Sequence, residues 1–140
     1  MSDEIYGNWR LEAVRYVFSD TGEEFLPFGD DPLGFITITR DNRLSTVITA
    51  RDRSPHPGET PEAAMIRTMF SYSGALTIRD GQFTALVDVA WVPAYVGTEQ
   101  IRNFTITDDR LVIATSETTF PAFPGRLGVA YLDWVRVAVA

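Results

Sequence analysis

Polar and apolar side chains alternate over short stretches along most of the chain, a pattern typical of half-buried β-strands. Turn-forming pairs such as Asp-Asn, Asp-Gly and Asp-Asp separate many of these stretches. The pattern predicts eight strands, covering residues 8–18, 35–39, 44–50, 72–78, 82–92, 97–106, 110–116 and 130–139. Consecutive hairpins of this kind favour an antiparallel up-and-down sheet.

One segment, residues 51–70, interrupts the alternation. The segment contains three prolines and a glycine, and its first half is expected to be a loop. In its second half, Thr60 is a suitable N-cap, Pro61 fits the first helical position and Glu62 the first turn. The segment therefore predicts one short helix with Ala64, Met65, Thr68 and Met69 at helical spacing. A second loop rich in proline and glycine is expected at residues 121–128.

Eight antiparallel strands are about enough to close into a barrel that is filled by side chains or holds one small ligand. Closure also removes exposed sheet edges. With 140 residues, the chain has the length of a single domain, residues 1–140. We therefore expect an all-β, eight-stranded antiparallel barrel with one short helix, and an open sheet or a sandwich is the alternative.

The strand at residues 97–106 combines a cation with apolar residues. One of its faces carries Thr98, Gln100, Arg102, Phe104 and Ile106. Burying that face would also bury Arg102, which is costly unless a partner compensates its charge. Asp88, on the preceding strand, is the expected partner. The apolar pattern of its own strand would instead point Asp88 to solvent, and both orientations stay open.

Charge and composition exclude several classes of function. A net charge of −7 argues against partners such as nucleic acid or an anionic membrane surface. No apolar run approaches the roughly 20 residues that cross a bilayer. The sequence has no cysteine, and its twelve basic residues are all arginine, so thiolate and Schiff-base chemistry are excluded. The first residues lack the features of a secretory signal, and we expect a cytoplasmic location.

Metal and triad chemistry find no support in the sequence. His56 is the only histidine and lies between two prolines, where a solvated loop residue is expected. No group of carboxylates has the spacing of a calcium loop, and no base accompanies a serine in a recognisable triad. We therefore expect neither a metal nor another cofactor.

Two short motifs and one longer run carry a family resemblance. The motifs are Gly7-Asn8-Trp9 near the start and Trp134-Val135-Arg136 near the end, and the run is PAYVGTEQIRNF at residues 93–104. Together with LPFGDDPLGFITIT they resemble the bacterial and fungal lipocalin-like domain family almost end to end. The resemblance implies a calycin-type barrel in which Trp9 closes one end and Arg136 packs across its ring.

The chain departs from this family at two places. A histidine pair that the family often carries corresponds here to Ala85 and Leu86, so a histidine-based role cannot be carried over. A family tryptophan corresponds to Tyr95. Glu99 lies in the shared run, but on the face opposite Arg102, where we expect it to brace a loop.

Three functions stay open. The first is binding of a small hydrophobic or aromatic molecule in the barrel, with its polar end fixed by interior side chains. The second is a cofactor-free cyclase or isomerase, in which Asp88 or Tyr72 moves a proton while Arg102 steadies an enolate or carboxylate. The third is a structural barrel or homo-oligomer with a filled core. The side chains expected to bind the ligand are Gln100, Arg102, Phe104, Tyr95 and Trp91.

Overall fold

The computed structural model describes residues 2–138 and contains one sheet of ten strands. The strands are β1 Gly7–Phe18, β2 Glu24–Phe25, β3 Leu33–Thr39, β4 Arg43–Thr49, β5 Met69–Arg79, β6 Gln82–Ala90, β7 Glu99–Thr107, β8 Arg110–Ala114, β9 Thr118–Phe120 and β10 Phe123–Arg136. The helices are α1 Pro61–Arg67 and the short 3₁₀ helices η1 Ser2–Ile5 and η2 Pro93–Tyr95.

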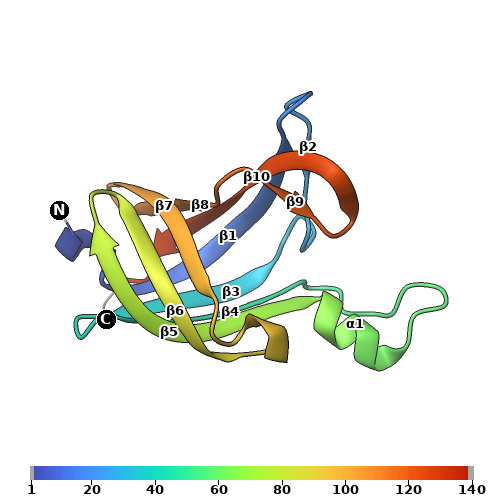
Figure 1. Cartoon of the computed structure of the whole chain (residues 1–140), viewed down its shortest axis with the longest axis horizontal. Helices are drawn as coiled ribbons and strands as arrows, with labels where there is room; N and C mark the ends of the chain where they lie inside the picture. Colours follow the sequence, from blue (N-terminus) through green and yellow to red (C-terminus); the bar gives the residue numbers. More distant parts are fainter. Residues whose placement is uncertain (1, 139–140) are drawn as a thin grey trace.

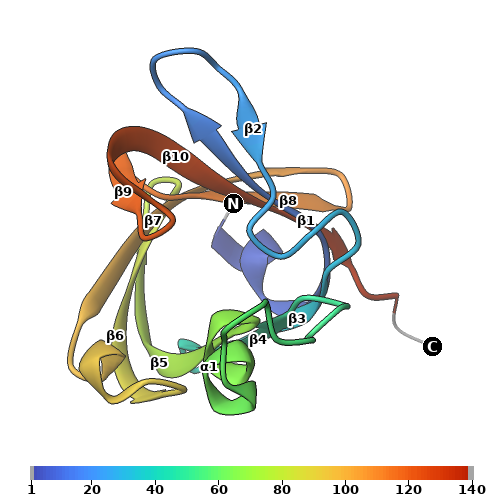
Figure 2. The ribbon, with the colours of Figure 1, turned by 90° about the vertical axis from the view of Figure 1, so that its right-hand side faces the viewer.

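The sheet closes into an antiparallel barrel. Strands β1, β3, β4, β5, β6, β7, β8 and β10 pair in this order, and β10 pairs with β1 to complete the ring. Apart from the short strands β2 and β9, each strand pairs with its neighbour in sequence (Figure 1). Figure 2 looks along the barrel, with η1 visible through the ring at the far end. This ring confirms the predicted eight-stranded up-and-down barrel. The alternative, an open sheet or a sandwich, is wrong.

The predicted hairpin turns form where expected. Asn42, Asp80 and Asp108 have positive φ angles of 64°, 45° and 54°. Turns with positive φ follow the right-handed twist of the strands that they join, and asparagine and aspartate tolerate this conformation. These local signals explain why the hairpins could be placed from the sequence.

A β-bulge changes which residues face outward at the end of β6. The pairing register shifts between Ser73 and Gly74 of β5, so Asp88 of β6 has no residue directly opposite it. A Cβ at Gly74 would lie only 2.3 Å from the backbone oxygen of Leu86, so the bulge requires glycine there. Because of the extra residue, Asp88 and Val89 are both exposed.

Helix α1 begins as predicted. The Thr60 hydroxyl accepts a hydrogen bond of 3.1 Å from the Ala63 amide, and Pro61 is the first helical residue. Among the apolar residues at helical spacing, Ala64 is buried, whereas Met65 is 58% exposed. No helix within residues 2–138 is both long and apolar enough to cross a membrane.

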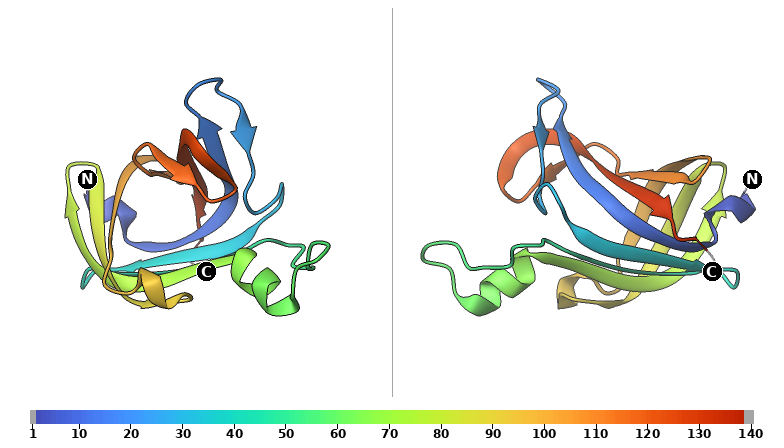
Figure 3. Two further views of the ribbon diagram at one scale, coloured as in Figure 1. Left: turned by 45° about the vertical axis from the view of Figure 1, so that its right-hand side comes forward. Right: turned by 180° about the vertical axis from the view of Figure 1, so that it is seen from behind.

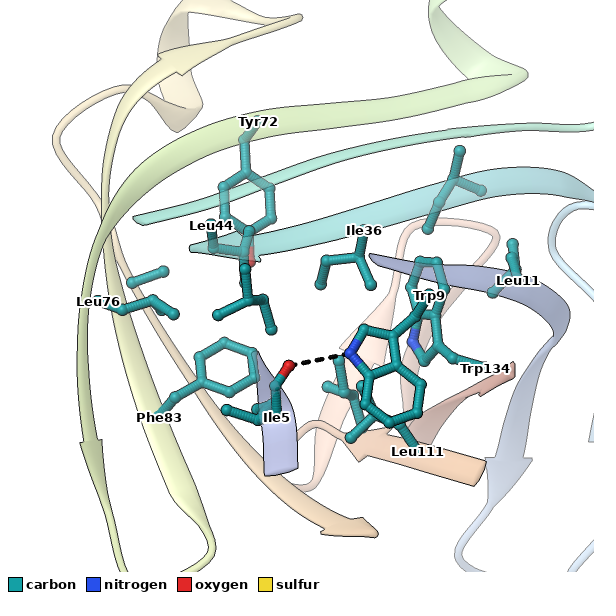
Figure 4. Packing of buried hydrophobic residues seen from close by; sticks show 14 of the residues in the cluster. Ile5, Trp9, Leu11, Ile36, Leu44, Tyr72, Leu76, Phe83, Leu111 and Trp134 are labelled. Carbon is teal, nitrogen blue, oxygen red and sulfur yellow. Dashed lines mark hydrogen bonds between the residues drawn. The ribbon is translucent and has the colours of Figure 1, made fainter. Parts of the chain in front are cut away.

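The barrel interior near η1 is filled by a large apolar core. Trp9 is wholly buried and donates a hydrogen bond of 2.9 Å from its Nε1 to the Ile5 backbone oxygen (Figure 4). The Arg136 guanidinium carbon lies 4.1 Å from the centroid of a Trp9 ring, the contact implied by the family resemblance. This end, which η1 covers, is the closed end; the opposite end, beside α1 and η2, is the mouth.

The region beyond the barrel differs from the sequence prediction. Residues 121–128, expected to be a loop, include the start of β10, and neither β9 nor β2 was predicted. Figure 3 shows these segments extending past the barrel, across the mouth from α1. The predicted last strand was to end at Val139, which lies outside the described residues. Five rings in mutual contact stabilise this extension: Tyr16, Phe18, Phe25, Phe120 and Phe123.

Candidate functional site

The inner face of β7 is the least buried part of the barrel wall. Its inward side chains Gln100, Arg102, Phe104 and Ile106 are all partly exposed. Arg102 pairs across the sheet with Phe83, which is 1% exposed and belongs to the core. Directly opposed residues share a face, so Arg102 points inward as predicted. Inward side chains that keep part of their surface exposed indicate that solvent reaches this face.

Asp88 is not the partner of Arg102. It lies on the outer wall, where its two carboxylate oxygens accept hydrogen bonds of 2.9 and 2.5 Å from the Arg43 guanidinium. These hydrogen bonds lower the pKa of Asp88 below its ordinary value. The alternation of β6 accounts for the outward position, because Asp88 follows the buried Val87. The expected Asp88–Arg102 pair is therefore wrong, and Asp88 has no access to the interior.

Neutral groups accept the hydrogen bonds of Arg102 instead. Its guanidinium donates to the Ile101 backbone oxygen at 2.9 Å and to Gln100 Oε1 at 2.7 Å. Gln100 Nε2 then donates to Thr98 Oγ1 at 2.9 Å, and that hydroxyl donates to the Tyr95 backbone oxygen at 2.6 Å. No carboxylate of residues 2–138 forms an ion pair with Arg102. Its positive charge is thus solvated and hydrogen-bonded but not neutralised.

Four aromatic side chains pack together on the mouth side of this polar row. They come from three elements, the start of β5, the residue after β6 and η2. Ring centroids are 4.8 Å apart for Phe70 and Trp91, 5.1 Å for Trp91 and Tyr95, and 5.6 Å for Tyr72 and Tyr95. We refer to Phe70, Tyr72, Trp91 and Tyr95 as the aromatic cluster. It offers an apolar surface of mutually inclined rings beside the Arg102 charge.

Two donors of the aromatic cluster have no protein acceptor. Tyr72 is 6% exposed, and its hydroxyl forms no hydrogen bond with the rest of the described chain. The Trp91 Nε1 is buried and equally unpartnered. Burial raises the pKa of Tyr72 and that of Tyr95, and the nearby Arg102 charge opposes both shifts. Both phenols therefore keep their protons at neutral pH.

Other candidate residues lie outside this group. Glu99 is exposed on the outer face. His56 is exposed in the loop before α1, where its backbone amide donates to Glu59 Oε1 at 2.9 Å. Arg53 donates to Thr68 Oγ1 at 2.9 Å beside the helix end, and Arg51 pairs with an exposed aspartate. No group of three potential metal ligands occurs within the described residues.

Phe70 is the site residue that sequence reasoning missed. It lies two positions before Tyr72 on the same strand and so shares its inward face, a signal that strand alternation contained. The sequence pattern began the strand at Tyr72, whereas β5 begins at Met69. Arg43, the partner of Asp88, had no comparable signal because it lies 45 residues away.

Two surface clefts lie away from the aromatic cluster. One of about 560 Å³ opens at the closed end and touches the inner face of β7 at Phe104 and Ile106, with Glu4, Arg79 and Asp80 at its edge. Another of about 420 Å³ lies between Tyr6 and the β3–β4 turn. Both are bordered by turn residues and lack a buried, unpartnered donor. The aromatic cluster with Arg102 is therefore the stronger candidate site.

Comparison with known protein families agrees with this architecture. A family model described as a lipocalin-like domain matches residues 6–137. The chain belongs to the lipocalin-like domain family. A search of curated proteins finds no match. A lipocalin-like barrel is an architecture suited to holding small molecules.

Ala85 and Leu86, the positions where the resemblance suggested a histidine pair, lie on opposite faces of β6. Ala85 is wholly buried and faces Gln100 across the sheet, whereas Leu86 is 52% exposed on the outer wall. Neither carries an ionisable group.

Proposed function

We propose that this lipocalin-like barrel binds a small hydrophobic or aromatic molecule, with its apolar part against the aromatic cluster and its polar end at Arg102. The observation that carries the proposal is the partial exposure of the inward side chains Gln100 and Arg102, next to the aromatic cluster. In a barrel with a filled core these side chains would be as buried as Phe83 and Ala85. A purely structural role is therefore the weaker alternative.

Gln100, Arg102 and Phe104 are assigned to the β7 wall of the site. Gln100 holds the guanidinium through its Oε1 and is itself held by Thr98. Trp91 and Tyr95 supply ring surface, and Tyr72 supplies a free hydroxyl. This combination of apolar walls and a few placed polar groups is what small-molecule sites share.

The alternative of a cyclase or isomerase loses one of its expected groups. Asp88 cannot move a proton inside the barrel because it lies on the outer wall. Tyr72 and Arg102 remain as an acid and an electrostatic stabiliser, but the carboxylates of β6 and β7, Asp88 and Glu99, both face outward. Proton abstraction lacks its strongest candidate base, which favours binding over turnover.

A fluorescence titration with the neutral apolar probe N-phenylnaphthylamine tests the proposal. We expect saturable enhancement with one probe per chain. Trp91→Ala should weaken probe binding about tenfold, because aromatic contact area is lost. Val89→Ala is the matched control, since Val89 is 61% exposed on the outer wall. Absence of saturable binding, or equal loss in both variants, would overturn the proposed site.

A further inference from the structure

We infer that the site selects ligands carrying an anionic oxygen, such as a carboxylate, phenolate or enolate, over neutral or cationic ligands of the same shape. The inference rests on the proposed function and adds the chemical class of the ligand. It starts from the hydrogen-bonding character of the polar groups around the aromatic cluster.

The aromatic cluster carries two free hydrogen-bond donors. Trp91 Nε1–H can only donate, and it is buried without an acceptor. The Tyr72 hydroxyl also has no acceptor in the described chain and stays protonated because burial raises its pKa. A buried donor without a partner, such as the Trp91 Nε1–H, is destabilising and rare in folded proteins. A ligand oxygen at this position would satisfy such donors.

The acceptors at the site are already occupied. Gln100 Oε1 accepts from Arg102, and Thr98 Oγ1 accepts from Gln100 Nε2. An ammonium group would have to break this row or use the hydroxyl oxygens of Tyr72 and Tyr95, and the Arg102 charge would repel it. A ligand that only accepts would leave it intact.

The charge of Arg102 also favours an anionic ligand. Arg102 is positively charged at any physiological pH, and no carboxylate of the described residues pairs with it. Two other arginines of the barrel wall are neutralised, Arg43 by Asp88 and Arg15 by Asp133. The charge of Arg102 is therefore available to a ligand, and its interaction with an anion is stronger in a partly desolvated site than in water.

The placement of these groups brings charge and donors to one location. The Arg102 charge acts on both Tyr72 and Tyr95, opposing the rise in the pKa of each. Tyr72 and Tyr95 also lie against each other, with ring centroids 5.6 Å apart. An oxygen between Arg102 and the phenols would meet a cation and hydroxyl donors together.

Three naphthalene derivatives of matched size test the inference by titration calorimetry at pH 7 and low salt. They carry a carboxylate, a carboxamide or a methylammonium group. We expect the carboxylate to bind at least about tenfold more tightly than the carboxamide, as a charge-assisted hydrogen bond allows. The ammonium compound should bind most weakly. Added salt should weaken only the carboxylate.

Variants distinguish a specific contact of Arg102 with the ligand from a loss of the folded structure. Arg102→Met should reduce carboxylate affinity to that of the carboxamide and leave N-phenylnaphthylamine binding unchanged. Arg51→Met, at an exposed pair with Asp31, should change neither. Should Arg102→Met fail to fold, Tyr72→Phe should weaken the carboxylate several-fold while sparing the neutral probe.

The outcomes distinguish this inference from the proposed function. Equal affinities of the carboxylate and carboxamide for the unmodified protein, together with saturable binding of the neutral probe, would overturn the anion preference alone. Failure of every compound, including the neutral probe, would overturn both. Tighter binding of the ammonium compound would also contradict the inference.

Discussion

Replacing Trp9 with alanine removes the ring that fills the closed end of the barrel. Trp9 is 0% exposed, and its Nε1 donates to the Ile5 backbone oxygen, which anchors η1. Its other face supports the Arg136 guanidinium at 4.1 Å. The substitution thus leaves a cavity, frees a buried carbonyl and removes a cation–π contact at the same time.

The structure allows these effects to be ranked. Truncating a buried large aromatic side chain costs about 3–5 kcal/mol of unfolding free energy. The lost hydrogen bond, about 1 kcal/mol, places Trp9→Ala toward the upper end of that range. Arg136→Met removes the cation–π contact and the hydrogen bonds to the backbone oxygens of Tyr6 and Glu4. It should therefore cost less, about 1–2 kcal/mol.

Urea unfolding followed by far-ultraviolet circular dichroism measures both changes without relying on tryptophan emission. Trp9→Ala should lower the midpoint by about 2 M or prevent folding, given the slope expected for a small domain. Arg136→Met should lower it by less than about 1 M. Arg110→Met is the control, because Arg110 is an exposed arginine on the outer wall that pairs with Glu12. Unchanged midpoints for Trp9→Ala and Arg136→Met would refute their assigned role at the closed end.

Three further predictions concern the bulge, the outer wall and pH. Gly74→Ala should destabilise the fold by about 2 kcal/mol or more, because its Cβ would lie 2.3 Å from the Leu86 oxygen; an unchanged thermal midpoint would contradict this account of the bulge. Asp88→Asn should leave ligand affinity unchanged, since the carboxylate binds Arg43 on the outer wall; a large loss measured by the probe titration would place Asp88 in the site after all. Burial raises the pKa of Tyr72 above its ordinary 10.0, so the folded state keeps a proton that the unfolded chain releases and stability should fall as pH rises above about 10. Tyr72→Phe should make that fall shallower in urea unfolding at pH 9 and 11, and an identical slope would contradict the burial of this phenol.

Local patterns in the sequence determined the hairpins, the helix start and the inward face of β7. Each depends on residues close together in the chain: Asp-Gly at a turn, Thr60 before Pro61, and alternation that puts Arg102 on the face of Phe104. Such signals can be recognised in the sequence because turn geometry and strand period are properties of a few neighbouring residues. Closure of the barrel also followed, from the number of consecutive strands.

Only the tertiary structure decided the partners and the exposure of the site residues. A bulge, required by close backbone approach at Gly74, exposes Val89 beside Asp88, which the alternation along β6 already turns outward. Its ion pair forms with Arg43 from a strand that is not adjacent to β6. Such register shifts and contacts between distant segments leave no periodic signal in a single sequence. Alternation along β7 showed that Arg102 points inward. Only the folded barrel showed that no carboxylate pairs with Arg102 and that two unpartnered donors, on Tyr72 and Trp91, lie nearby.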